Sequence, residues 1–389
     1  MTGIEAPGKK EFPIPMSHKS RDFVADLLSL ADVKINGHRP WDIQVHDDRL
    51  YSRVLSGGSL AVGESYMDAW WDAESLDQFF CQVLKADLDK KITGFKNVLW
   101  LGVKSIVMNM QGKRRAYNIG QKHYDIGNDL YQSMLDKRMN YSCAYWSHSE
   151  NLDDAQESKL ELCCKKLGLK PGLSVLDIGC GWGAFAQYAT EKYGVNVTGI
   201  TVSKEQVGLA KHMCEGLPVE IKLQDYRSLD GQFDRIISIG MIEHVGYKNY
   251  RTYMKIVNKS LADDGLFLLQ TIGSNTSGIS GEPWMDKYIF PDGMLPSPAH
   301  LTKAIEGLFV LEDWHNFGMH YDKTLMAWHS NFVRNWEKIS RNKKYDERFF
   351  RMWTYYLLSC AGAFRARKDQ LWQIVLSKKG VPGGYETIR

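Results

Sequence analysis

The order of hydrophobic and polar positions predicts alternating strands and helices over the middle of the chain. Between short apolar runs, apolar residues recur with helical spacing, most clearly at residues 203–214 and 247–261. Buried strands that alternate with amphipathic helices are typical of an α/β fold, so we expect a doubly wound, mainly parallel sheet. The runs typical of buried parallel strands are residues 175–178, 195–200, 219–223, 233–239 and 266–272.

The C-terminal third continues with longer helical patterns. Apolar residues at helical spacing predict helices at residues 325–336 and 349–364, and residues 371–376 predict a late strand. We expect that strand at the antiparallel edge of the sheet. We also expect the tail beyond residue 379 to be frayed.

The N-terminal part has a different pattern. Residues 1–20 are polar and contain proline, which predicts an arm without a core of its own. A helical pattern at residues 23–28 and strand patterns near residues 42–45 and 51–55 follow. Residues 21–112 are therefore expected to form a smaller α+β domain.

The stretch from residue 80 to residue 123 combines positive charge with a wide apolar stripe. A basic amphipathic helix of this kind either lies on an anionic membrane surface or joins two domains with its charged face in solvent. The pattern alone leaves both interpretations open. The basic residues, set against only Asp87 and Asp89, are Lys85, Lys90, Lys91, Lys96, Lys104, Lys113, Arg114, Arg115 and Lys122.

Composition argues against several classes of protein. The formal net charge is only +3, whereas a protein that is basic all over for nucleic acid would carry far more. The 7 cysteines lack paired Cys-x-x-Cys spacing, which favours free thiols in a reducing cytosol over a disulfide framework or a zinc site. The N-terminal residues do not resemble a signal peptide, and no run approaches the roughly eighteen apolar residues that span a bilayer.

A glycine-rich turn follows the first predicted strand. Asp177 lies at the end of that strand, and Gly179, Gly181 and Gly183 allow a tight turn that brings the backbone close to a nucleotide-like ligand. This spacing also occurs in purely structural turns. No acid follows where a dinucleotide-binding fold holds ribose, and the chain lacks the Gly-Lys-Ser/Thr of a triphosphate-binding loop. The turn instead resembles the first motif of class I methyltransferases that use S-adenosylmethionine, whose strand order we therefore expect.

Five motifs in sequence order extend this resemblance over nearly the whole chain. Together they resemble the cyclopropane-fatty-acyl-phospholipid synthase family, whose catalytic half is shared by the mycolic acid cyclopropane synthases. The motifs are His-Tyr-Asp-Ile-Gly-Asn-Asp (123–129), Tyr-Ser-Cys-Ala-Tyr-Trp (141–146), Leu-Asp-Ile-Gly-Cys-Gly-Trp-Gly (176–183), Gly-Met-Ile-Glu-His-Val-Gly (240–246) and Tyr-Tyr-Leu-Leu-Ser-Cys-Ala-Gly-Ala-Phe-Arg (355–365).

The resemblance implies an enzyme that transfers a methyl group from S-adenosylmethionine to a cis double bond of a phospholipid acyl chain, removes a proton and closes a cyclopropane ring. It implies a lipid-associated N-terminal domain at residues 21–112, a basic linker at 113–122 and a catalytic domain at 123–389. It further implies a homodimer in the cytoplasm, peripheral at the inner membrane surface, with the bilayer and not nucleic acid as its partner.

The resemblance also assigns candidate catalytic residues. A bound bicarbonate ion is the expected base, held by backbone groups of Cys143 and Ile272 and by the side chains of Glu243 and Tyr321. From its position alone, Glu243 is also a candidate helix cap. Cys360 matches a family cysteine, but alkene methylation needs no covalent enzyme intermediate, so we expect a structural role.

Gln270 departs from the family pattern, which has histidine in this position. A glutamine amide still donates a hydrogen bond, but it cannot become a cation or relay a proton. The alternative product is therefore a methyl-branched or methylene fatty acyl chain, made by an S-adenosylmethionine-dependent fatty acyl methyltransferase.

Cofactor contacts follow from the same motif matching. Tyr141 and Ser142 are expected near the methionine part, and Thr201 and Gln206 are expected at the ribose hydroxyls, in place of the usual acid. For Asp225 a turn or cap role is an equal alternative. The full expected cofactor set is Tyr141, Ser142, Asp177, Gly179, Gly181, Gly183, Thr201, Gln206, Asp225, Tyr226 and Arg227.

Two other classes of function stay open on the sequence. One is a methyltransferase of small soluble acceptors or nucleic acid, which would act without lipid. The other is a non-enzymatic lipid sensor that binds S-adenosylmethionine, and the presence of Glu243 and Tyr321 argues against it.

Overall fold

A computed structural model describes residues 18–87 and 127–389. The basic stretch at residues 80–123 falls mostly outside these residues, as do the linker at 113–122 and most of the first motif. In the two described parts, no helix is long and apolar enough to cross a membrane.

The N-terminal elements are α1 (His18–Ser29), β1 (Ile43–Val45), α2 (Arg49–Met67), β2 (Trp71–Ala73) and α3 (Leu76–Lys85). The helix predicted at 23–28 and the strand predicted near 42–45 are present. The strand predicted at 51–55 is wrong, because these residues form part of α2. In addition, α1 begins at His18, inside the predicted arm.

The α/β part contains a 7-stranded sheet with the order β5-β4-β3-β6-β7-β9-β8. Strands β3 to β7 are parallel, whereas β9 is antiparallel to both of its neighbours. The strands are β3 (Ser174–Ile178), β4 (Asn196–Thr201), β5 (Val219–Leu223), β6 (Phe233–Ile239), β7 (Leu261–Ser274), β8 (Val310–Asn316) and β9 (Asp369–Ser377). This confirms the expected doubly wound α/β fold.

Two predictions for the C-terminus are wrong. The strand predicted at 371–376 forms as β9, but it lies inside the sheet, because the unpredicted β8 takes the edge. The tail beyond residue 379 is tied to the fold and is not frayed. The Tyr385 hydroxyl donates to the carbonyl oxygen of Lys166 at 2.8 Å, and the Arg389 guanidinium pairs with the Asp313 carboxylate at 2.6 Å.

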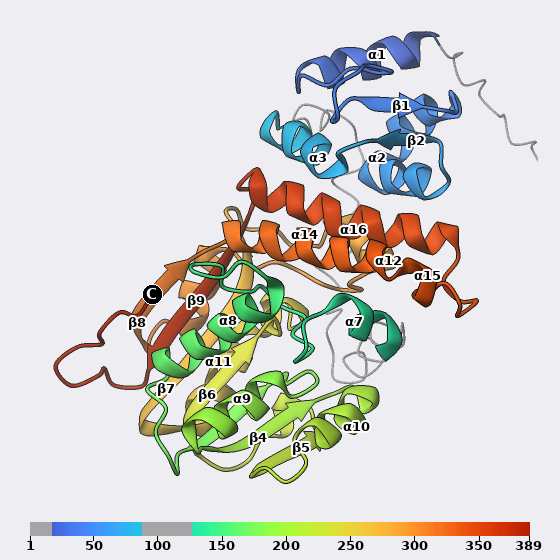
Figure 1. Ribbon diagram of the computed structural model, residues 1–389. Coiled ribbons are helices and arrows are strands. Elements are labelled where there is room, and N and C mark those ends of the chain that lie inside the picture. The colour runs from blue at the N-terminus through green and yellow to red at the C-terminus, as the bar shows by residue number, and fades with distance from the viewer. Residues whose placement is uncertain (1–17, 88–126) are drawn as a thin grey trace, which may run out of the picture.

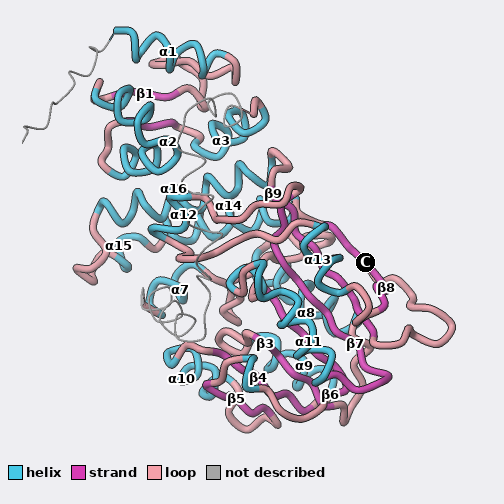
Figure 2. Tube along the Cα trace, turned by 180° about the vertical axis from the view of Figure 1, so that it is seen from behind, coloured by secondary structure: helices cyan, strands magenta, loops and turns pink. Residues whose placement is uncertain are grey.

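Helices cover both faces of the sheet (Figures 1 and 2). Side chains alternate along each strand, so neighbours such as Ile236 and Ile237 belong to different hydrophobic clusters. On one face the strands pack against α11 (Tyr250–Ser260) and α13 (Pro298–Ile305), and on the other against α8 (Leu152–Lys166) and α9 (Ala184–Tyr193). The sheet core is therefore two apolar layers separated by the strands.

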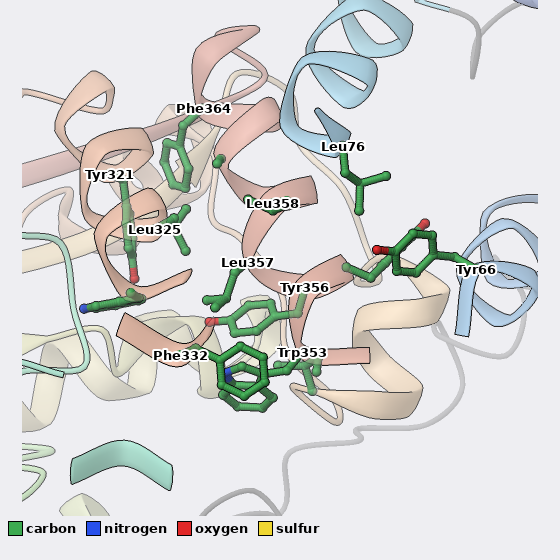
Figure 3. Packing of buried hydrophobic residues seen from close by; sticks show 14 of the residues in the cluster. Tyr66, Leu76, Tyr321, Leu325, Phe332, Trp353, Tyr356, Leu357, Leu358 and Phe364 are labelled. Carbon is green, nitrogen blue, oxygen red and sulfur yellow. The ribbon is translucent and has the colours of Figure 1, made fainter. Parts of the chain in front are cut away.

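A third hydrophobic cluster joins the N-terminal elements to the helices beside the sheet. Its centre is the helix pair α14 (Met319–Arg334) and α16 (Glu347–Arg365). In Figure 3, α16 lies between Tyr321 of α14 on one side and Leu76 and Tyr66 of the N-terminal elements on the other. The other α-helices within residues 18–87 and 127–389 are α7 (Asn128–Met134), α10 (Lys204–Met213), α12 (Pro283–Tyr288) and α15 (Trp336–Ile339).

Candidate active site

A cavity of about 190 Å³ lies at the carboxyl ends of β3, β4 and β6, and we call it the polar cavity because several polar side chains line it. Gly183 does not line it; this residue precedes α9, where its φ of 87° suits glycine. The predicted cofactor residues that line the cavity are Tyr141, Ser142, Asp177, Gly179, Gly181, Thr201, Gln206, Asp225, Tyr226 and Arg227. The structure thus brings together all but one of the set.

The glycine turn shapes this cavity through positive backbone angles. Gly179 has φ 84° and Gly181 has φ 55°, a region that side chains other than glycine rarely adopt. A Cβ atom at Gly179 would also lie 3.0 Å from the Met241 side chain. Glycine is therefore required here both by conformation and by space, which lets a ligand approach the backbone.

Asp177 places a buried carboxyl group beneath this turn. Its side chain lines the cavity although the residue is only 3% exposed. Burial raises the pKa of the carboxyl to about 7, and the nearby positive charge of Lys159 opposes the rise. A cationic amino group in the cavity would favour the ionised carboxylate, so Asp177 fits a ligand with an ammonium group.

Lys159 is a part of this site that the sequence did not indicate. Its ammonium group is buried and donates hydrogen bonds to Asn140 Oδ1 at 2.7 Å and to Ser142 Oγ at 3.2 Å. Gln156 Nε2 donates to the carbonyl oxygen of Ser142 at 2.8 Å. These bonds fix the Tyr141–Ser142 segment as a wall of the cavity. A lysine on a helix gives no sequence signal for such a role, because it is usually exposed.

The residues expected at ribose and adenine form local pairs. Thr201 Oγ1 donates to Gln206 Oε1 at 2.7 Å, so the two expected ribose contacts are bonded to each other. Asp225 accepts from the Arg227 backbone N–H at 2.8 Å and pairs with its guanidinium at 3.0 Å. Asp225 therefore has the capping role that was left open, while it also lines the cavity. Tyr226 is buried against the core, which leaves less of its ring for a ligand.

A larger, mainly apolar cavity of about 440 Å³ adjoins the polar one. Tyr141, Ser142, Gly240 and His244 line both, so the two cavities share a wall. His244, which sequence reasoning did not single out, belongs to that wall, and burial lowers its pKa to about 4. The predicted catalytic residues that line the larger cavity are Cys143, Glu243, Gln270, Ile272, Tyr321 and Cys360.

Glu243 presents a buried carboxyl group to the larger cavity. It belongs to the short 3-10 helix Ile242–His244, which directly follows β6 and Gly240. Its Oε1 accepts from the backbone N–H of Ile272 at 2.8 Å, whereas its Oε2 has no hydrogen-bond partner among the described residues. Burial raises the pKa of this carboxyl to about 7. The carboxyl group can therefore hold or release a proton near neutral pH. The Ile272 N–H orients this group through its hydrogen bond to Oε1.

Tyr321 and Cys143 lie in an aromatic and apolar environment. The Tyr321 ring packs 4.7 Å from Phe364 and 5.9 Å from Trp328, centroid to centroid, and Figure 3 shows it beside Phe364 and Leu325. Burial holds the pKa of Tyr321 well above its usual range, so its hydroxyl stays protonated and can donate. Cys143 is fully buried, and its Sγ donates to the Ala144 carbonyl oxygen at 3.3 Å.

Gln270 is held by a second glutamine. Its Oε1 accepts from Gln373 Nε2 at 2.9 Å, so its own amide NH₂ is the group available to donate toward the cavity. Gln373, on β9, was not expected from the sequence. The pair arises because β9 lies next to β7 and puts Gln270 and Gln373 opposite each other.

Cys360 also lines the larger cavity, on α16. Burial raises the pKa of its thiol, so the nucleophilic thiolate is disfavoured. Tyr356, one turn earlier on the same helix, forms a hydrogen bond between its hydroxyl and that of Tyr141 at 2.8 Å. Both tyrosines line the larger cavity, and Tyr141 also belongs to the shared wall.

The chemistry of the two cavities is complementary. The polar one has a glycine turn and a buried carboxyl group, which suits a charged, nucleoside-like ligand. The larger one presents a mainly apolar surface and has a carboxyl group in its wall that can hold or release a proton. The shared wall would bring the reactive group of one ligand next to the other.

Comparisons with known proteins agree with this geometry. The family model for mycolic acid cyclopropane synthetase matches residues 111–374. The cyclopropane-fatty-acyl-phospholipid synthase of Escherichia coli (strain K12) is 52% identical over 365 residues, which is 94% of each chain.

Solved structures of mycobacterial enzymes are also similar. The cyclopropane synthase MmaA2 from Mycobacterium tuberculosis has a TM-score of 0.64 and 30% identity, and the match covers 70% of this chain and 100% of that one. The mycolic acid cyclopropane synthase CmaA1 complexed with SAH and CTAB has a TM-score of 0.61 and 31% identity, covering 67% of this chain and 98% of that one. This chain therefore belongs to the mycolic acid cyclopropane synthetase family and is an S-adenosylmethionine-dependent methyltransferase.

Proposed function

We propose that the protein is a cyclopropane-fatty-acyl-phospholipid synthase, which adds a methylene group from S-adenosylmethionine to the cis double bond of unsaturated phospholipid acyl chains. The observation that carries the proposal is the wall shared by the polar and apolar cavities, with a buried carboxyl group beside it. The relative from Escherichia coli, similar over nearly the full length, supports the same substrate class.

The polar cavity fits S-adenosylmethionine, which when bound supplies a methyl group on a positively charged sulfur. Asp177 would meet the ammonium group, because its buried carboxyl lines the cavity and a cation there would favour its ionised form. The Thr201 and Gln206 side chains would meet ribose hydroxyls as neutral donors and acceptors. Ser142, held by Lys159, would keep the methionine end against the shared wall.

The apolar cavity fits an acyl chain and the cation that forms when an alkene is methylated. Tyr141, Tyr321, Phe290 and Tyr356 line it, and aromatic faces stabilise a nearby positive charge. Their bulk also excludes water, which would otherwise add to the cation. Phe290 and Tyr356 pack edge to face with their ring centroids 5.7 Å apart, so this part of the wall is closely packed.

Proton removal needs a weak base beside the transferred carbon. The buried, unpaired Glu243 Oε2 fits a bicarbonate ion, because a carboxyl group with its pKa raised to about 7 can share a proton with an anion instead of repelling it. The Tyr321 hydroxyl and the Gln270 amide would donate hydrogen bonds to the same ion. Bicarbonate would supply the base, and these side chains would hold it. The Ile272 N–H acts through Glu243, which differs from the direct contact that motif matching implies.

Mass spectrometry of phospholipids from cells that express the protein tests the proposal. We expect unsaturated chains to gain one CH₂ with loss of the alkene signal and appearance of cyclopropane protons in NMR. A methyl-branched or methylene chain would instead support the alternative product that Gln270 suggests. No change in the acyl chains, with methylation of a soluble acceptor, would contradict the proposal.

We further propose that the protein works as a homodimer at the inner membrane surface, with residues 21–112 as a lipid-associated domain. The positive charge and apolar stripe between residues 80 and 123 support this. Neutralising Lys113, Arg114 and Arg115 together should weaken binding to anionic vesicles by about 1 kcal/mol per charge. Vesicle co-sedimentation that is unaffected by the triple change would count against this surface, and analytical ultracentrifugation tests the dimer.

A further inference from the structure

Two side chains of the N-terminal helix α3 face the same cavity as the catalytic groups. Phe80 and Leu84, one helical turn apart, line the 440 Å³ cavity together with Ser59 of α2. Glu243 and Tyr321 line the same cavity. The family model begins at residue 111, so α2 and α3 lie outside the part of the chain that it matches.

Close packing fixes α3 against α16. Gly362 allows this approach, since a Cβ atom there would lie 2.6 Å from Phe80 Cβ and 2.7 Å from the Asp77 carbonyl oxygen. The Phe80 ring also packs edge to face on Tyr355, with 5.1 Å between centroids. Phe80 is therefore held in one place on the cavity wall and is not a loose side chain at the surface.

Ion pairs hold both ends of the same helix. Arg365 of α16 pairs with Asp77 at 2.5 Å and with Asp322 of α14 at 2.8 Å. Beyond the other end of α3, Asp87 forms an ion pair with Lys368, which itself lines the cavity. These contacts join the N-terminal elements to the helices that carry Tyr321 and Cys360. The cavity wall is therefore formed before an acyl chain binds.

We propose that Phe80, Leu84 and Ser59 are specificity-determining residues that select acyl chains by the position of their double bond. This inference rests on the proposed function. The catalytic groups and the α3 side chains line one cavity, so a chain whose double bond reaches Glu243 packs its remaining methylenes along a wall that includes α3. A fixed aromatic wall then favours one length of acyl chain beyond the double bond, because each added or missing methylene changes the apolar contacts with the wall.

The test is a competition within one population of vesicles, using full-length protein. Phosphatidylglycerol vesicles carry equal amounts of two octadecenoyl chains whose cis double bonds differ in position by two carbons, and gas chromatography with mass spectrometry gives the ratio of the two alkylated products. Because both chains share one vesicle, the ratio does not depend on how well the protein binds the membrane. Phe80→Ala enlarges the cavity and should change the ratio by about tenfold.

Ser59→Leu is the opposite change, because it adds bulk to the wall. Ser59 is exposed, so we expect the variant to fold. It should move the ratio in the direction opposite to Phe80→Ala. The matched controls are Val83→Ala on α3 and Ser56→Leu on α2, which do not line the cavity and should keep the parental ratio.

A Ser59→Leu ratio equal to the parental one would overturn the inference, even if Phe80→Ala failed to fold. A control that shifts the ratio as much as Phe80→Ala would also overturn it. The ratio can be read on cyclopropanated or branched chains, so a branched product would contradict the proposed function while leaving this inference testable. Absence of any alkylated product from the parental protein would reject both.

Discussion

Replacement of Glu243 by glutamine should make the protein more stable at alkaline pH while it abolishes most of the activity. Glu243 is 7% exposed, and burial raises the pKa of its carboxyl from 4.5 to about 7. In the unfolded chain the carboxyl ionises near its usual pKa, whereas in the folded protein it keeps its proton up to about pH 7. The folded state therefore carries the cost of a buried charge once both states are ionised.

The magnitude follows from the shift. A shift of one pKa unit corresponds to about 1.4 kcal/mol, so the shift of Glu243 costs about 3 kcal/mol above pH 7. Below pH 4.5 the carboxyl is protonated in both the folded and the unfolded protein, so it costs no stability. The free energy of unfolding then falls as the pH rises from 4.5 to 7, because only the unfolded chain ionises freely in this range. The glutamine amide stays neutral and keeps an oxygen for the Ile272 N–H, so it avoids this loss.

Denaturant unfolding at a series of pH values from 4.5 to 8, in buffers free of carbon dioxide, measures the effect. We expect Glu243→Gln to exceed the parental free energy of unfolding by up to about 3 kcal/mol at pH 8 and to match it at the acid end. Glu150→Gln, at an exposed position, is the control, and its free energy of unfolding should match that of the parental protein at both ends of the pH series. The reasoning would be refuted if Glu243→Gln and the parental protein had the same free energy of unfolding at pH 8. It would also be refuted if their difference were equal at the acid and alkaline ends of the pH series.

Activity separates this role from a structural one. Glu243→Gln should lower kcat by about 100-fold or more, because the amide cannot take or share a proton. Affinity for S-adenosylhomocysteine should stay within about twofold, since the carboxyl group lies in the cavity next to the cofactor residues and not among them. An unchanged kcat would reject a catalytic role for this carboxyl.

Three other substitutions test separate parts of the site. Lys159→Met should weaken S-adenosylhomocysteine binding by about tenfold in calorimetry, because it removes one of the bonds that hold Ser142 and leaves Asn140 Oδ1 without its donor. Gly362→Ala should lower the free energy of unfolding by about 1–3 kcal/mol, since its Cβ would overlap α3; an unaffected stability would show that the two helices separate freely. Cys360→Ala should keep activity within about twofold, and complete loss would assign chemistry to the thiol.

The strands of the sheet could be predicted where apolar residues recur along a short run. Runs such as Val219–Leu223 and Phe233–Ile239 have the bounds that their apolar residues predict. Strand β8 was missed because residues such as Glu312 and His315 give it too little apolar character. The position of β9 was misjudged for the same reason, since its interior place depends on the missed neighbour.

The candidate site was predicted unevenly. Motif matching identified residues that line both cavities, because these motifs follow the ends of strands, where open α/β sheets bind ligands. It did not identify Lys159, Gln373 or the cavity-facing side of α3. Each of these depends on a contact between segments far apart in the chain, such as Gln373 with Gln270, and no local pattern in a single sequence records such contacts.

The buried charges of the site explain why so much aromatic packing surrounds it. Asp177 and Glu243 both have raised pKa values, and Lys159 has a lowered one, so each costs stability in its charged form. A site open to water would avoid this cost, but water would also quench a carbocation. The cluster around α14 and α16 offsets the cost through buried aromatic residues such as Trp328 and Trp353. Because α3 packs on the same cluster, the N-terminal elements contribute both to the stability that permits a dry cavity and to the wall of the cavity itself.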